Sequence, residues 1–248
     1  MEISINGLKT NYQSYGEGKP LIILHGWQSN LERWTPVAEE IAKKGFRVIV
    51  PDLPGFGKSD ALTIPWNTNK YINWLEGFVS EIGVRDYYLL GHSFGGALAS
   101  KMAVKHVQDI RKIFLVSAAC VRKKTTQKNF LKNIAKVAKI FYFFPYYSFL
   151  RKAVYKFIIR KSDYVYVDGI MKETYLNIVG EDLSFHLPFI KVPTVVIWGE
   201  KDESTPLQDG QFIAKQIKNS KLIVIPGASH KLNREIAEAL VENILHNV

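Results

Sequence analysis

The chain lacks most of the residues that build secreted or membrane-spanning proteins. Cys120 is the only cysteine among 248 residues, so neither a disulfide nor a thiolate metal cluster can form within one chain. The apolar run near residues 140–144 stops at Pro145, far short of the roughly 20 residues that span a bilayer. The first ten residues have no basic and apolar signal pattern. We therefore expect a cytoplasmic protein with no metal and no organic cofactor.

Acidic residues are missing from one stretch of the chain. Residues 121–161 hold 12 basic residues and no acidic residue, while the net charge of the whole chain is only +10. The two flanking parts are therefore slightly acidic when taken together. A nucleic-acid binder that is basic throughout would not show this distribution, so we expect no nucleic-acid partner. The pattern predicts a near-neutral scaffold that carries a basic insert.

Apolar residues make up 47% of the chain and charged residues 23%, which predicts a folded domain with a substantial core. Short apolar runs alternate with segments of helical periodicity. The expected strands are Glu2–Ile5, Leu8–Tyr15, Leu21–Leu24, Arg47–Val50, Tyr87–Leu90, Ile113–Ser117, Thr194–Trp198 and Leu222–Ile225. The expected helices are Trp34–Lys44, Thr68–Ile82, a helix that ends at His106, Gln208–Ile217 and Glu235–Leu245.

The order of these elements predicts an α/β fold. Two antiparallel strands come first, joined at Asn6-Gly7, a dipeptide typical of tight hairpins. Repeated strand–helix units follow, which predict a mostly parallel sheet with helices on both faces. Residues 121–190 show helical patterns and no convincing strand, so we expect them to form an insert over the sheet.

A Gly-x-Ser-x-Gly motif lies between an expected strand and an expected helix, at Gly91-His92-Ser93-Phe94-Gly95. In this context the turn is so tight that small residues must stand two positions before and after the serine. The serine hydroxyl is then exposed at the carboxyl edge of the sheet. Glycine-rich phosphate-binding loops usually have the pattern Gly-x-Gly-x-x-Gly or a Gly-Lys-Ser/Thr ending, and neither is present here. We therefore expect Ser93 to be a nucleophile.

A serine nucleophile needs a base, and the base needs a carboxylate to orient it. His230 follows the last expected strand and would lie at the same sheet edge as Ser93. Asp202 lies three residues beyond the glycine that ends the strand Thr194–Trp198, and is favoured over Glu200 and Glu203. The chain order Ser93, Asp202, His230 is the order expected on this scaffold.

The oxyanion of an acyl-transfer transition state needs hydrogen-bond donors. The backbone N–H of Phe94, directly after the nucleophile, is one expected donor. The backbone N–H of Trp27 is the other, because Gly26 allows the loop after Leu21–Leu24 to approach the acyl oxygen closely.

These motifs together resemble the α/β-hydrolase superfamily, of the alpha/beta hydrolase-1 type. The matching segments are Leu24–Trp27, Pro51–Ser59, Gly91–Gly96, Gly199–Asp202 and Gly227–His230. The resemblance implies an eight-stranded sheet with an antiparallel second strand, and a helical cap between strands six and seven. We thus expect a core domain of residues 1–120 and 191–248, and a cap of residues 121–190. Haloalkane dehalogenases and epoxide hydrolases of this superfamily have an Asp at the elbow, and Ser93 argues against both.

The expected activity is that of a serine esterase, which cleaves apolar acyl or aryl esters through an acyl-enzyme. Five residues are expected to line its substrate pocket: His25, His92, Phe141, Phe144 and Tyr147. The alternatives are a C–C bond hydrolase, a thioesterase or a peptidase with the same triad, or a non-catalytic binding protein. The basic segment 121–161 has three interpretations: a solvated surface, a dock for an anionic membrane, or a dock for an acidic carrier protein.

Overall fold

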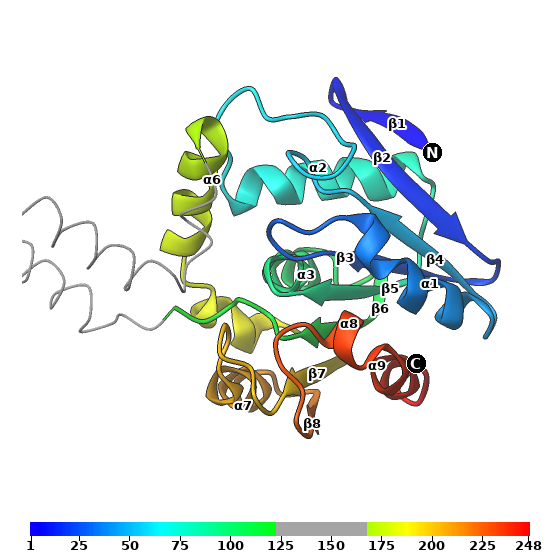
Figure 1. The fold of residues 1–248 in the computed structure, drawn as a ribbon, viewed down its shortest axis with the longest axis vertical. Coiled ribbons are helices and arrows are strands. Elements are labelled where there is room, and N and C mark those ends of the chain that lie inside the picture. The colour runs from blue at the N-terminus through cyan, green and yellow to red at the C-terminus, as the bar shows by residue number, and fades with distance from the viewer. Residues whose placement is uncertain (123–167) are drawn as a thin grey trace, which may run out of the picture.

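The computed structural model describes residues 1–122 and 168–248 (Figure 1). Most of the expected cap, 121–190, and of the basic segment, 121–161, falls outside the described residues, so these expectations stay predictions. Within the described residues, every helix is too short or too polar to cross a membrane.

The described residues contain one eight-stranded sheet with the order β1-β2-β4-β3-β5-β6-β7-β8. Its strands are β1 (Glu2–Ile5), β2 (Leu8–Tyr15), β3 (Lys19–Leu24), β4 (Phe46–Pro51), β5 (Tyr87–His92), β6 (Ile110–Val116), β7 (Thr194–Gly199) and β8 (Ser220–Ile225). β2 is antiparallel to both of its neighbours, and all pairs from β4 to β8 are parallel. The expected mostly parallel α/β sheet with an antiparallel second strand is confirmed.

The hairpin between β1 and β2 forms as its sequence predicts. Ile5 pairs with Leu8, which leaves Asn6 and Gly7 as a two-residue turn. Both turn residues have positive φ, 50° for Asn6 and 80° for Gly7. Asn and Gly tolerate this left-handed region best, and such turns match the twist of a hairpin.

Helices cover both faces of the sheet. They are η1 (Leu31–Trp34), α1 (Thr35–Ala42), α2 (Thr68–Glu81), α3 (Phe94–Lys105), α6 (Gly169–Gly180), η3 (Ser184–Phe189), α7 (Leu207–Gln216), α8 (Leu232–Glu235) and α9 (Ala237–Leu245). The side chains of β3 show how two cores arise, because Ile22 and Leu24 pack with α2, α3 and α7. Leu21 and Ile23 point to the opposite face and pack with α1 and α9. A strand buried on both faces needs a continuous apolar run, which is what this sequence has.

The last helix differs from its expected start at Glu235. Ile236 has φ −145° and ψ 47°, which is not helical, so the chain forms the short α8 before α9 begins. Asn233 of α8 donates from its Nδ2 to the carbonyl of Arg33, 2.9 Å away. This bond ties the segment after β8 to the segment after β3, and both segments reach the candidate site.

The connection between β6 and β7 returns to the sheet through α6 and η3. Leu187 of η3 is fully buried in the core that also holds α3 and α7. α6 lies beyond the carboxyl ends of the parallel strands (Figure 1), and its Tyr175 and Ile178 line a cavity together with Ser93. In doubly wound sheets this edge is where ligands bind.

Candidate active site

Ser93 occupies the tight turn between β5 and α3 in a strained conformation, with φ 53° and ψ −113°. The turn is possible because its neighbours are glycines. A Cβ at Gly91 would lie 2.2 Å from the carbonyl oxygen of Gly95, and one at Gly95 would lie 2.2 Å from that of Leu24. Any side chain at these positions would push the helix away from the sheet. The glycine spacing seen in the sequence is therefore a steric requirement of this turn.

Hydrogen bonds hold Ser93 in place from both sides. Its N–H donates to the carbonyl of Val116 at 3.0 Å. Its own carbonyl accepts from the N–H groups of Ala97 and Ala119, at 3.1 Å and 2.9 Å. A strained backbone conformation of this kind costs on the order of 1–3 kcal/mol. It persists only where packing and hydrogen bonds of the surrounding structure hold it. The side chain remains partly exposed, toward the cavity.

Asp202 and His230 form a hydrogen-bonded pair at the same edge of the sheet. His230 Nδ1 lies 2.8 Å from Asp202 Oδ2. The other carboxylate oxygen, Oδ1, accepts from the backbone N–H groups of Ser204 and Thr205 at 2.9 Å and 2.8 Å. Thr205 Oγ1 also donates to Asp202 Oδ2 at 2.8 Å. The carboxylate is thus fixed by its own turn and presents one oxygen to the imidazole.

The surroundings of Asp202 favour its ionised form. Burial by itself would raise the pKa of Asp202, whose side chain is fully buried. The hydrogen bond and charge of His230, with the N–H of Thr205, outweigh burial and hold the pKa of Asp202 below its usual value. An ionised carboxylate at this place keeps the proton of the imidazole on Nδ1, so Nε2 is left as the free base.

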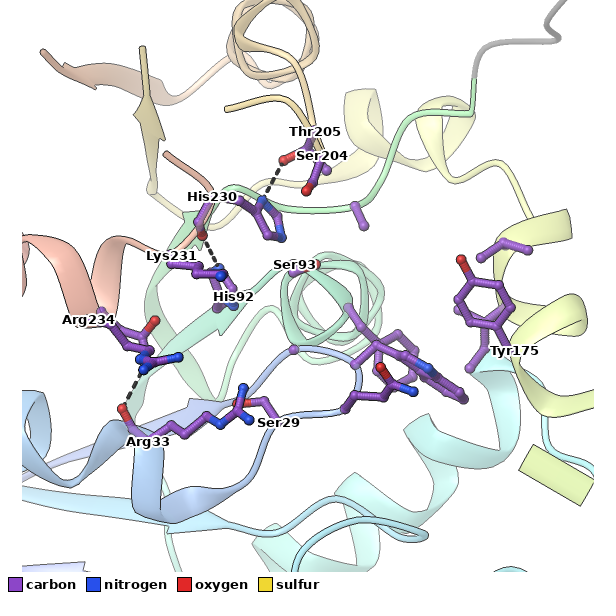
Figure 2. Close-up of a pocket in the computed structure, with 18 of the residues that line it drawn as sticks. Ser29, Arg33, His92, Ser93, Tyr175, Ser204, Thr205, His230, Lys231 and Arg234 are labelled. Atoms are coloured by element: carbon purple, nitrogen blue, oxygen red, sulfur yellow. Dashed lines mark hydrogen bonds between the residues drawn. The ribbon is translucent and has the colours of Figure 1, made fainter. Parts of the chain in front are cut away.

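Ser93 and His230 line the same cavity, and the ring of His230 lies beside Ser93 in Figure 2. No hydrogen bond joins the two side chains in the part of the chain that the structure describes. Contacts between nucleophile and base are often long without a bound substrate and tighten in the reacting complex. Three residues that the sequence places on three separate loops therefore meet at one site.

The loop after β3 presents a backbone N–H beside Ser93. The carbonyl of Gly26 is held by His25 Nδ1 at 2.8 Å and by the N–H of Ser29 at 3.2 Å. In a trans peptide the next N–H points the opposite way from this carbonyl, so the orientation of the Trp27 N–H is fixed too. Gly26 packs closely on the nucleophile, since a Cβ there would lie 3.2 Å from Ser93 Cβ.

Two backbone donors remain available at this place. Within the described residues, the N–H groups of Trp27 and Phe94 donate to no protein acceptor. Both residues line the cavity. The side chain of Trp27 packs against Phe56, Phe94 and Tyr175, with ring centroids 4.8, 5.7 and 5.3 Å away. The residue can therefore be anchored by its ring while its N–H faces the cavity.

His25 and His92, both expected in the pocket, occupy different places. His25 is fully buried and lies behind the cavity wall, because its Nε2 accepts from the N–H of Leu53 at 2.9 Å. Burial lowers the pKa of His25 to about 4, so this acceptor stays unprotonated at neutral pH. His92 does line the cavity, and its Nε2 donates to the carbonyl of His230 at 2.9 Å. Burial lowers the pKa of His92 to about 3.

The cavity has a volume of about 420 Å³, enough for a small organic substrate. The other expected pocket residues, Phe141, Phe144 and Tyr147, lie outside the described residues. Sequence reasoning missed several residues that line the cavity: Thr205, Tyr175, Arg33, Arg122 and Arg234. Thr205 had a signal, since an Asp followed by Ser-Thr at two and three residues is typical of a carboxylate that caps its own turn. Tyr175 had none, because only the tertiary structure brings α6 over Ser93.

No group of three or more His, Cys, Asp or Glu residues in the described ranges could hold a metal ion. The polar groups assembled here are a hydroxyl, an imidazole, a carboxylate and backbone donors. A set of this kind can perform nucleophilic acyl chemistry.

Known proteins resemble this chain over most of its length. A family model described as "alpha/beta hydrolase fold" matches residues 19–153, more than half of the chain. The chain is 27% identical over 241 residues to the AB hydrolase superfamily protein YisY of Bacillus subtilis, covering 88% of this chain and 87% of that protein. It is 25% identical over 262 residues to a 2-hydroxy-6-oxo-6-phenylhexa-2,4-dienoate hydrolase of Burkholderia cepacia, covering 96% and 90%.

The fold also matches solved structures. The crystal structure of the enol-lactonase from Burkholderia xenovorans superposes with a TM-score of 0.76 at 24% identity, covering 99% of this chain and 98% of that one. At this identity the likeness shows the shared fold.

Proposed function

Because the chain belongs to the alpha/beta hydrolase fold family, we propose that it is a serine hydrolase that cleaves carboxylic esters with apolar acyl or aryl groups. The observation that carries the proposal is one cavity lined by both the strained Ser93 and the His230 that Asp202 orients. Fold alone does not decide function, so the proposal rests on this site.

The first step is attack of Ser93 Oγ on the acyl carbon. His230 Nε2 takes the hydroxyl proton as the bond forms, and the ionised Asp202 stabilises the resulting imidazolium through Nδ1. The carbonyl oxygen becomes an oxyanion and accepts from the N–H groups of Trp27 and Phe94. The loss of such a donor costs on the order of 100-fold or more in rate, so these backbone groups supply a large part of the acceleration.

The second half of the reaction uses the same groups. His230 donates its proton to the leaving alcohol, and the acyl group stays on Ser93 as an ester. Water then attacks this ester while His230 Nε2 accepts a water proton, and the acid leaves with Ser93 Oγ reprotonated. The rings of Trp27 and Tyr175 and the side chain of Ile178 line one part of the cavity, which favours an apolar acyl or aryl group there.

Covalent labelling tests the nucleophile directly. Wild-type protein should react with a fluorophosphonate and hydrolyse p-nitrophenyl esters, whereas Ser93→Ala should do neither, with kcat lower by on the order of 10³ or more. Ser80→Ala, which changes an exposed serine of α2, is the matched control and should behave as wild type. Full ester hydrolysis by Ser93→Ala would refute the mechanism.

A C–C bond hydrolase with the same triad is the second candidate. It is favoured by the relative from Burkholderia cepacia, whose name describes a hydrolase of a phenylhexadienoate that carries a ketone. A panel of esters, thioesters, vinylogous diketones and aminoacyl amides, compared by kcat/KM, separates the candidates. A higher kcat/KM for the diketones than for the esters would favour the C–C bond hydrolase over the esterase.

A further inference from the structure

The walls of the catalytic cavity differ in charge from a typical apolar ester pocket. Among the described residues that line it, four carry a positive charge: Arg33, Arg122, Lys231 and Arg234. No Asp or Glu of residues 1–122 and 168–248 lines the cavity. The expected basic segment 121–161 contributes only Arg122 to this set, so three of the cations belong to the near-neutral remainder of the chain. Among the described residues, the positive charge at the cavity therefore comes mainly from outside the basic segment.

Three of these cations have no carboxylate partner in the described residues. The ion pairs of this part of the chain include none with Arg33, Lys231 or Arg234. The acidic residues next to them in sequence are engaged elsewhere. Glu32 pairs with Lys58 Nζ at 3.1 Å, and Glu235 accepts from the N–H and hydroxyl of Ser229 at 3.2 Å and 2.8 Å. Like charges held together without a counter-ion repel one another, and an anion between them removes this repulsion.

The backbone that carries the cations is fixed. Arg33 belongs to η1 and Arg234 to α8, and the bond from Asn233 Nδ2 to the carbonyl of Arg33 joins these two elements. The N–H of Arg234 donates to the carbonyl of Lys231 at 2.9 Å. The three residues are exposed, yet their backbone positions are held relative to one another by these hydrogen bonds. An anion would thus meet a prearranged group of donors.

The cavity is polarised from one side to the other. Figure 2 shows Lys231, Arg234 and Arg33 on one side of Ser93, and Tyr175 on the opposite side. Tyr175 belongs to the same wall as Ile178 and Val179 of α6 and packs against Trp27. A substrate whose scissile bond lies at Ser93 can therefore reach the wall of Arg33, Lys231 and Arg234 in one direction. In the other direction it meets the largely apolar wall of α6, where Arg122 is the single cation among the described lining residues.

We propose that the natural substrate is a small anionic ester, with a carboxylate or phosphate group bound by Arg33, Lys231 and Arg234 and an apolar group directed toward α6. This proposal rests on the esterase function and assigns its substrate class. Guanidinium groups bind planar anions in a bidentate manner, and such charge-assisted bonds are stronger than neutral ones. The cations also draw anions to the mouth of the site before binding.

The experiment compares esters that differ only in charge. The probes are aryl hemi-esters of dicarboxylic acids, their phosphonate counterparts, and neutral methyl-capped counterparts of equal chain length. Wild-type kcat/KM for at least one anionic series should exceed the neutral value by about tenfold or more, the scale of a charge-assisted hydrogen bond. The series that gains more identifies the anion as a carboxylate or a phosphate.

Substitutions locate the effect on the cationic wall. The double variant Arg33→Gln/Arg234→Gln should lose most of the anionic preference, mainly through KM, while hydrolysis of the neutral ester stays within about threefold. Arg85→Gln is the matched control, since this exposed arginine precedes β5 and so lies at the opposite edge of the sheet. Thermal unfolding of each variant checks that the fold is intact.

The outcomes separate this proposal from the function on which it rests. Equal kcat/KM for charged and neutral esters, or a preference unchanged in the double variant, would overturn the anionic substrate and leave the esterase standing. Hydrolysis of none of the probes by wild-type protein would remove the esterase itself. A preference that falls with added sodium chloride in the wild type only would support the proposal, because salt screens exposed charges.

Discussion

Ser93 shows how a single residue depends on its neighbours for its chemistry. Its positive φ exposes the hydroxyl, and the glycines at positions 91 and 95 permit the close approach of strand and helix that holds it there. The same argument applies to Asp202, which would be an ordinary loop carboxylate without the donors of its turn. The proposed role of Ser93 thus depends on a strained backbone, and that of Asp202 on hydrogen bonds that restrict the motion of its carboxylate.

Substitution of Asp202 by Asn tests the orientation of the imidazole. An amide can donate to His230 Nδ1, which moves the imidazole proton to Nε2 and removes the base that Ser93 needs. We expect kcat to fall by on the order of 10³–10⁴, as for the equivalent change in serine proteases, with little loss of thermal stability. Steady-state kinetics with a p-nitrophenyl ester measures this effect.

Glu200→Gln is the matched control for Asp202→Asn. Glu200 lies in the same loop and accepts from the N–H of Gly227 at 2.8 Å, a bond that Gln can also make. This variant should keep kcat close to that of the wild type. Equal losses in both variants would show that the loop, and not the Asp202 carboxylate, matters.

Among the helices, α6 belongs to the long connection between β6 and β7 and forms one wall of the cavity. A hydrogen bond and an ion pair hold it against the rest of the protein. Thr174 Oγ1 accepts from the N–H of Trp66 at 3.0 Å, and Glu181, just past its end, pairs with Lys101 Nζ at 2.7 Å. Lys101 also donates to Thr68 Oγ1 and Asn69 Oδ1, so α2, α3 and α6 meet at one ammonium group.

Lys101→Met should destabilise the protein and loosen α6. The Lys101 side chain is only 11% exposed, and its removal leaves Glu181 without its charged partner in a largely buried place. We expect a loss of about 2 kcal/mol or more in the free energy of unfolding, measured in urea, and a higher KM for esters with bulky apolar groups.

Lys105→Met provides the comparison one turn further along α3. Lys105 also forms an ion pair, with Glu76 at 2.6 Å, but its side chain is 55% exposed. Exposed pairs contribute about 0–1 kcal/mol, so this variant should unfold near the wild-type midpoint and keep its KM. An equal loss in the two variants would contradict the anchoring role of Lys101.

At the scale of the whole molecule, buried histidines link stability to pH. Burial lowers the pKa of His25 to about 4 and that of His92 to about 3, while an unfolded chain protonates histidine near pH 6.5. Between these values the unfolded state binds more protons than the folded state, so stability falls as the pH falls. The lowered pKa of Asp202 acts in the same direction at still lower pH.

Urea unfolding at several pH values measures this linkage. Stability should be constant above pH 7 and decline from about pH 6.5 toward pH 4, by about 2 kcal/mol for each histidine at pH 5. His92→Asn can still donate to the carbonyl of His230 but cannot titrate, so its decline should be shallower. The same slope in wild type and variant would mean that His92 does not contribute.

Local sequence patterns were enough to predict the sheet, the hairpin and the positions of Ser93, Asp202 and His230 on separate loops. These features follow from local rules: periodicity, turn residues, and glycines where no side chain fits. The start of α9 was placed wrongly because the backbone of Ile236 has no local signature. The tertiary structure alone decided what surrounds Ser93, namely Tyr175 of α6 on one side and Arg33 and Arg234 on the other. Such neighbours come from elements far apart in the chain, and no short-range pattern encodes a contact that only packing creates.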